Sequence, residues 1–196
     1  MNILLLGGIG SGKSEALKIL KEEHNANIIE ADKVAHFLYE KDRAGYTALK
    51  SLFGDTILDD KKDIDRKKLG DILYYDKDKL SKVDEIIHPL VNAEIKKRLL
   101  DNRLNVVEQA LMPDENFYDS VWYLYTDMEV RIKRLMLSRG LSRERIETII
   151  SKQPKESDFE SIADKIIKNN GDRSELEKNI REALRWHFET GKLGKR

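Results

Sequence analysis

The chain has 196 residues, enough for one α/β domain with a modest insertion and a sizeable core, and too few for several large domains. Its 36 basic and 36 acidic side chains balance, so no overall field draws it to nucleic acid or to an anionic membrane, and any phosphate binding must be local. Because it contains no cysteine, it has neither a disulfide framework nor a thiolate metal site, and we expect a cytoplasmic location.

Five short β-rich runs alternate with helical patterns along the chain. The first, at residues 3–6, is apolar on both faces and ends at two glycines, which is typical of a buried strand and argues against a signal peptide or a membrane span. The other four cover residues 27–30, 105–109, 120–125 and 165–168. We therefore predict an α/β fold with a five-stranded parallel sheet and helices on both of its faces.

A glycine-rich segment with the spacing of a P-loop follows the first strand. It reads Gly7-Gly8-Ile9-Gly10-Ser11-Gly12-Lys13-Ser14, and apolar residues at helical spacing come after it. Glycines let the backbone wrap around phosphate oxygens, and the amides at the start of the helix point at the anion. Lys13 would then contact the β and γ phosphates of ATP, and Ser14 would hold Mg²⁺.

The alternative is a glycine-rich turn that matches this motif by chance, but the strand before it and the helix after it favour nucleotide binding. The same loop serves kinases, GTPases and ATPases. The chain has no Asn-Lys-x-Asp pattern for reading guanine, and at this length we expect no regulatory or coupling domain. A small-molecule kinase is therefore the favoured class.

Residues 32–102 are helical in pattern almost throughout, which is too much helix for one crossover between strands. We expect a helical acceptor-binding insertion here, over the carboxyl ends of the strands, where open α/β sheets bind their ligands. Asp32 begins this insertion. Its carboxylate could accept the proton of an attacking hydroxyl or hold the water shell of the metal, or it could instead cap a helix over residues 33–40; the neighbouring P-loop favours catalysis.

Residues 131–145, between the fourth and fifth strands, are dense in arginine and broken by Gly140. Kinases close an arginine-bearing lid over the nucleotide, because charge on the transferred phosphoryl group needs fixed cations and excluded water. We place a lid at about residues 131–159, with Arg134 and Arg139 as its candidates, whereas Arg131 suits an ordinary basic amphipathic helix. The core then covers about residues 1–31, 103–130 and 160–196.

Several sequence blocks resemble the dephospho-coenzyme A kinase family and occur in the family's order over about residues 1–180. Besides the P-loop they are Glu30-Ala31-Asp32 with Ala35-His36, Phe53-Gly54, Asp65-Arg66, Ile86-Ile87-His88-Pro89, and Ala163-Asp164 with Ile167, Asn169 and Gly171. The resemblance implies a P-loop kinase fold and transfer of the γ-phosphoryl group of ATP to the ribose 3′-hydroxyl of dephospho-coenzyme A, the last step of coenzyme A biosynthesis. It further implies a requirement for Mg²⁺, no nucleic-acid or membrane partner, and a monomer or small homo-oligomer.

Carried over to this chain, the resemblance assigns catalytic roles to Lys13, Asp32 and Arg139. It places the nucleotide against Gly8, Ile9, Gly10, Ser11, Gly12, Lys13, Ser14, Arg134 and Asn169, the last beside adenine. It places the acceptor against Asp32, His36, Arg66, His88, Pro89 and Leu111. Two of these have structural alternatives: Arg66 could be a surface arginine that opens a helix, and the segment of His88 and Pro89 could end one helix and start another.

The chain departs from the family pattern in two places. Ser138 stands where the family's lid has arginine, and Ala110-Leu111-Met112-Pro113-Asp114 replaces Pro-Leu-Leu-Phe-Glu after the third strand. Two other functions therefore stay open at this point: another small-molecule kinase, for a nucleoside or nucleotide, and a non-catalytic relative that binds nucleotide or coenzyme A.

Overall fold

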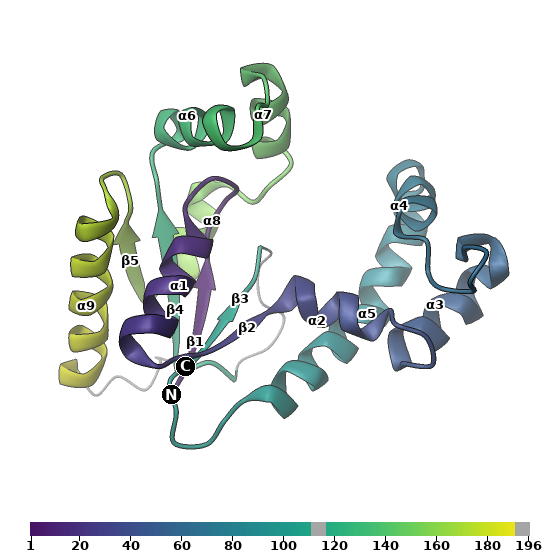
Figure 1. Ribbon diagram of the computed structural model, residues 1–196, viewed down its shortest axis with the longest axis horizontal. Coiled ribbons are helices and arrows are strands. Elements are labelled where there is room, and N and C mark those ends of the chain that lie inside the picture. The colour runs from purple at the N-terminus through teal and green to yellow at the C-terminus, as the bar shows by residue number, and fades with distance from the viewer. Residues whose placement is uncertain (111–116, 191–196) are drawn as a thin grey trace. The chain divides into compact units, whose positions relative to one another are not determined.

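The computed structural model describes residues 1–110 and 117–190, and in it five strands form one sheet with the order β2-β3-β1-β4-β5 (Figure 1). The strands are β1 (Asn2–Leu6), β2 (Asn27–Glu30), β3 (Asn105–Glu108), β4 (Ser120–Tyr125) and β5 (Lys165–Lys168). Strand β1 pairs in parallel with β3 and β4, and β4 pairs in parallel with β5. The predicted α/β fold with a five-stranded parallel sheet is confirmed.

The sheet is covered on both faces, which explains why β1 is apolar from Ile3 to Leu6. Residues Ile3, Leu4, Leu5 and Leu6 all have 0% exposure, and full burial of one such side chain contributes about 1.5–3 kcal/mol. One face packs against the helices α1 (Lys13–His24) and α9 (Arg173–Thr190). On the other face the Tyr123 ring stacks on Phe159 of α8 (Glu156–Ile162), with 5.1 Å between the ring centroids.

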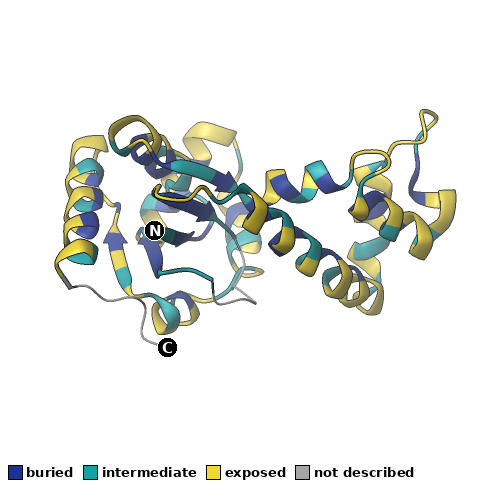
Figure 2. Cartoon of the chain, turned by 90° about the horizontal axis from the view of Figure 1, so that it is seen from below, coloured by how far each residue is buried: buried dark blue, intermediate teal, exposed yellow. Residues whose placement is uncertain are grey.

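The chain divides into two compact units, Met1–Ile29 with Leu99–Arg196, and Glu30–Arg98. The first contains the sheet together with α1, α6 (Met128–Arg139), α7 (Arg143–Ile150), α8 and α9. The second consists of α2 (Ala31–Leu38), α3 (Ala44–Phe53), the short 3-10 helix η1 (Gly54–Ile57), α4 (Arg66–Tyr75) and α5 (Lys77–Arg98). Figure 2 shows buried stripes along the strands and along the helices of both units. In the described part of the chain no helix is long and apolar enough to cross a bilayer.

Two local expectations for the second unit are wrong. Pro89 neither ends nor begins a helix, because it lies inside α5, which is 22 residues long. An interior proline costs about 3 kcal/mol, but the helix buries Val83, Ile87 and Ile95, which outweighs that cost. Asp32 is not a helix cap either: α2 begins at Ala31 with Glu30 at the cap position, so Asp32 lies within the first turn.

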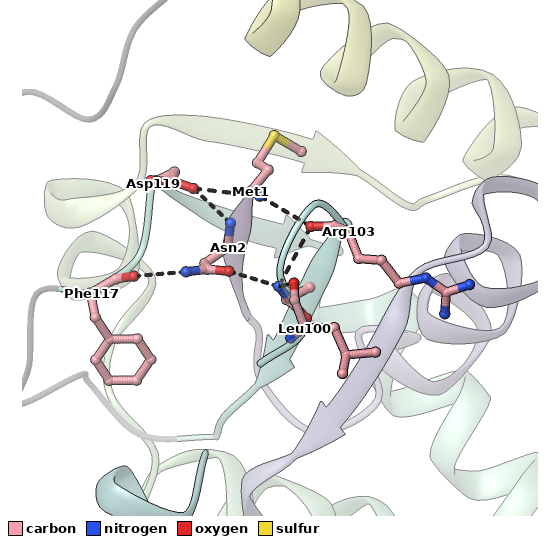
Figure 3. Close-up of polar contacts among 7 residues, drawn as sticks. Met1, Asn2, Leu100, Arg103, Phe117 and Asp119 are labelled. Atoms are coloured by element: carbon pink, nitrogen blue, oxygen red, sulfur yellow. Dashed lines mark hydrogen bonds and ion pairs between the residues drawn. The ribbon is translucent and has the colours of Figure 1, made fainter. Parts of the chain in front are cut away.

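The amino ends of the central strands are fastened by a network of short polar side chains (Figure 3). The buried Asn105 donates through Nδ2 to Asn2 Oδ1 at 2.9 Å and to the Leu100 carbonyl at 3.0 Å. Its Oδ1 accepts from the Leu100 amide at 2.9 Å and from Asn27 Nδ2 at 2.8 Å. The backbone amide of Asn2 in turn donates to Asp119 Oδ2 at 2.7 Å. One amide side chain thus joins β1, β2 and β3 to the segment that returns from α5.

Candidate active site

The glycine-rich loop lies between the carboxyl end of β1 and the start of α1. Gly10 and Gly12 have φ of 77° and 92°, a region that favours glycine. Gly12 occupies the cap position of α1 and, as a glycine, has no side chain with which to cap the helix. A helix start that lacks a side-chain cap is suited to an anion, because its amides and its dipole both point at the ligand.

Close packing behind the loop also requires glycine. A Cβ atom at Gly8 would overlap the guanidinium of Arg131, and one at Gly12 would overlap the Asn169 amide. One side of the loop therefore packs against side chains from distant parts of the sequence. The opposite side is the one that would face a ligand.

Lys13 is the first residue of α1, and its ammonium group turns back over the loop. Its Nζ donates to the Gly7 carbonyl at 2.6 Å and lies 3.5 Å from Glu108 Oε1. Glu108 ends β3, the neighbour of β1, and both side chains are largely buried, at 15% and 14% exposure. Sequence reasoning missed Glu108, although a carboxylate that ends an apolar strand was a usable signal.

Arg131 is buried, which corrects its interpretation as part of an ordinary amphipathic helix. Its side chain is 7% exposed, and its Nε donates to the Ile9 carbonyl at 2.8 Å. The Ile9 amide donates to Gln153 Oε1 at 2.8 Å. Burial lowers the pKa of the Arg131 guanidinium, while nearby Tyr123 and Glu156 oppose that shift. Arg131 and Gln153 therefore belong to the surroundings of the loop.

Asn169 and Thr126 brace the loop on the side of β5. The Asn169 Nδ2 donates to the Ser11 carbonyl at 2.7 Å, and the Thr126 hydroxyl lies 3.0 Å from the same oxygen. Asn169, which the sequence placed beside adenine, is thus bound to the loop itself through its amide nitrogen.

Two buried polar atoms beside the loop have no hydrogen-bond partner among the described residues: Ser11 Oγ and Arg134 Nη1. The other terminal nitrogen of Arg134 donates to the Gly171 carbonyl at 3.0 Å, which holds the guanidinium near Gly12. Buried polar groups are nearly always paired, so these two atoms fit a ligand with several hydrogen-bonding groups, such as a nucleotide. Arg139, the other lid candidate, is the exposed last residue of α6.

In the second unit the structure brings together His36 of α2 and Arg66 of α4. Arg66 Nη1 lies 3.0 Å from His36 Nε2, so that ring nitrogen accepts from the guanidinium. Arg66 does open its helix, after the cap residue Asp65. Both side chains line a pocket of about 410 Å³ with Tyr39, Lys41, Asp63 and their neighbours. Burial, aided by Asp84, raises the pKa of Tyr39, so its hydroxyl stays a donor at neutral pH.

The remaining predicted acceptor residues lie on α2 and α5 or outside the described residues. Asp32 lies in the first turn of α2, in the same unit as His36 and Arg66. His88 lies on α5 with its Nε2 3.8 Å from Asp84, one residue before Pro89. Leu111 lies outside the described residues.

With this geometry in view, comparison with known proteins decides the family. A family model described as dephospho-CoA kinase matches residues 1–175. The chain belongs to the dephospho-CoA kinase family. The resemblance read from the sequence blocks is therefore confirmed.

The chain also aligns with individual members of this family over nearly their whole length. The dephospho-CoA kinase of Lactobacillus johnsonii is 35% identical over 188 residues, which cover 92% of this chain and 94% of that protein. The dephospho-CoA kinase of Aquifex aeolicus is 34% identical over 184 residues, which cover 91% and 93%. The structure of dephospho-CoA kinase from Campylobacter jejuni matches with a TM-score of 0.69 at 25% identity, over 97% of this chain and 98% of that one.

Within this family member, the structure adds Glu108, Arg131 and Gln153 to the residues around the P-loop. Arg131 and Gln153 carry little local signal, since each contacts Ile9 from more than 120 positions away: 122 for Arg131 and 144 for Gln153. Only the folded chain brings them to the loop.

Proposed function

We propose that this chain transfers the γ-phosphoryl group of ATP to the ribose 3′-hydroxyl of dephospho-CoA. The observation that carries the proposal is the glycine loop at the start of α1, which has no side-chain cap, in a chain of the dephospho-CoA kinase family. The rival acceptors gain no support, because the relatives compared above are named dephospho-CoA kinases over more than nine-tenths of both chains.

On the donor side, the loop from Gly8 to Ser14 holds the triphosphate with its backbone amides, and Lys13 contacts the β and γ phosphates. Ser14 would hold Mg²⁺ through its hydroxyl, and the bound ion would neutralise negative charge on the phosphates. Arg134 and Asn169 flank the nucleotide. The glycines support this assignment, as do Ser11 Oγ and Arg134 Nη1, which have no hydrogen-bond partner within residues 1–110 and 117–190.

On the acceptor side, Asp32 takes the proton of the ribose 3′-hydroxyl while the oxygen of that hydroxyl attacks the γ-phosphorus. The bond from the γ-phosphorus to the β,γ-bridging oxygen breaks, and ADP leaves. The pocket lined by His36, Lys41 and Arg66 binds anionic groups of the acceptor, because a guanidinium suits phosphate oxygens. His88, Pro89 and Leu111 complete the acceptor site.

The predicted division of labour follows from this chemistry. The insertion at about residues 32–102 binds the acceptor, the segment 131–159 acts as a lid, and Arg139 meets the transferred phosphoryl group when the lid closes. The proposal includes action in the cytoplasm as a monomer or small homo-oligomer, on a small-molecule substrate and without nucleic acid or membrane.

A coupled assay of ADP release against a panel of acceptors tests this function. The panel contains dephospho-CoA, adenosine, AMP and shikimate, with Lys13→Ala as the inactive control, and ³¹P NMR locates the new phosphate. We expect turnover with dephospho-CoA alone and a 3′-monophosphate resonance in the product. Turnover that prefers a nucleoside or nucleotide, or tight binding of dephospho-CoA and ATP without turnover, would overturn the proposal.

A further inference from the structure

The backbone of Ile9 in the glycine loop is held on both sides by side chains from outside the loop. Its carbonyl accepts from Arg131 Nε at 2.8 Å, and its amide donates to Gln153 Oε1 at 2.8 Å. Arg131 Nη2 also donates to Gln153 Oε1, at 3.3 Å. The three residues thus form a closed ring of hydrogen bonds, with one member in the loop, one on α6 and one just after α7.

The position of Arg131 makes this ring more than a surface contact. Its side chain is 7% exposed and packs against Gly8, and its nearest carboxylate is that of Glu156 at 3.8 Å. Placing a guanidinium at a buried site has a large desolvation cost, which excellent geometry and additional hydrogen bonds must offset. Two of the partners that offset it here are the Ile9 carbonyl and Gln153, so the cation is held on the phosphate loop.

The loop needs such a restraint because of its composition. Ile9 stands between Gly8 and Gly10, and Gly10 has φ of 77°. Peptides next to glycine rotate with little steric hindrance, and one rotated peptide would turn a carbonyl oxygen toward a bound anion in place of an amide. Side chains that grip both the amide and the carbonyl of Ile9 prevent this rotation before the ligand arrives. Such preorganised dipoles are the source of strong electrostatic stabilisation.

We infer that Gln153 and Arg131 are positioning residues for ATP, which act through the Ile9 backbone and not through direct contact with the reacting atoms. The inference rests on the proposed function, since it takes the glycine loop as the ATP site. The inference also couples the segment between α7 and α8 to nucleotide binding. When Gln153 is displaced, the glycine loop becomes less ordered, and when the loop is ordered, Gln153 stays bound to it.

A matched pair of substitutions tests the role of the Gln153 oxygen. Gln153→Met keeps the length of the side chain but removes the acceptor, whereas Gln153→Glu keeps an acceptor oxygen next to Arg131. We expect Gln153→Met to weaken ATP binding in calorimetry by roughly tenfold, the effect of about one hydrogen bond, and to lower kcat, with the KM for dephospho-CoA unchanged. Gln153→Glu should stay within about threefold of the wild type.

Arg131→Lys provides the second arm, because lysine keeps the charge but loses the planar fork whose Nε and Nη2 reach Ile9 and Gln153 at the same time. We expect it to weaken ATP binding as Gln153→Met does, while the exposed control Arg185→Lys on α9, outside the lid, leaves binding unchanged. Circular dichroism checks that each variant is folded. A Gln153→Met protein that binds ATP like the wild type, or a Gln153→Glu protein as impaired as Gln153→Met, would overturn the inference.

Hydrogen exchange on the unmodified protein gives a test that needs no variant. Without ATP, we expect the Ile9 amide to exchange slowly, since Gln153 engages it. Exchange as fast as that of an exposed loop amide would overturn the inference. Wild-type protein that fails to bind ATP in calorimetry would instead remove the proposed function, so the two failures are distinguishable.

Discussion

The two ends of the sheet use polar side chains in opposite ways. At the amino ends of β1, β2 and β3, Asn105 bonds to Asn2, Asn27 and Leu100, so these amide groups satisfy one another. Figure 3 shows the part of this network around Asn2 and Leu100. At the amino end of β4, the buried Ser120 Oγ has no hydrogen-bond partner among the described residues. At the carboxyl end of β1, the loop leaves two buried polar atoms, Ser11 Oγ and Arg134 Nη1, without a partner among the described residues. The first end stabilises the fold, and the second is prepared for a ligand.

The topology explains this difference. In a parallel sheet with helical crossovers, the carboxyl ends of the strands lead into the amino ends of the helices, where amides and the helix dipole attract anions. The amino ends of the strands receive no such field. At the amino ends, short amide and carboxylate side chains pair with one another and with the backbone. At the carboxyl end of β1, Lys13, Arg131 and Arg134 surround one loop.

The largest expected effect is that of Lys13→Ala, which removes the cation of the loop. We expect kcat/KM to fall on the order of 10³- to 10⁵-fold, the range for a cation placed on a transferred phosphoryl group. The melting temperature should fall as well, because the largely buried Glu108 loses the ammonium group that lies 3.5 Å from it, so activity is compared per folded molecule. Steady-state kinetics and a thermal melt measure both, with the exposed Lys18→Ala on α1 as the control. Wild-type activity in the Lys13 variant would remove the loop from the mechanism.

The next effect is that of Asp32→Asn, which keeps the size of the side chain but removes its basicity. We expect kcat to fall by about 10²- to 10⁴-fold while ATP affinity stays unchanged, because a general base acts on the acceptor hydroxyl. Single-turnover kinetics and calorimetry with ATP separate the two quantities. A loss confined to ATP affinity would make Asp32 a residue of the metal site or of the structure.

The smallest effect is expected at the opposite end of the sheet, with Asn105→Ala. It leaves the buried polar groups of Asn2 and Leu100 without their partner, so we expect a loss of about 1–3 kcal/mol in the free energy of unfolding. Urea denaturation measures this loss, and Asn179→Ala, which removes one exposed hydrogen bond, should cost less. Activity per folded molecule should be unchanged. A variant with normal stability and impaired catalysis would contradict the division between the two ends.

Local patterns were sufficient for the strands, the P-loop and the family. The apolar run at residues 3–6 and the glycines that follow it predict a buried strand and a phosphate loop, because backbone conformation and burial depend on neighbouring residues. Local reasoning also left open the alternative that the segment of His88 and Pro89 ends one helix and starts another, and this alternative is wrong. There the burial of α5 against the rest of its unit outweighs the cost of the proline.

The sequence by itself therefore determined that this chain has an α/β fold with a phosphate-binding loop, and which family it resembles. Only the tertiary structure decided which side chains hold that loop: Glu108 beside Lys13, and Arg131 and Gln153 on Ile9. The physical reason is that a hydrogen bond depends on where two groups meet in space. Residues more than 90 positions apart, as all of these pairs are, meet only when the sheet and its helices have assembled.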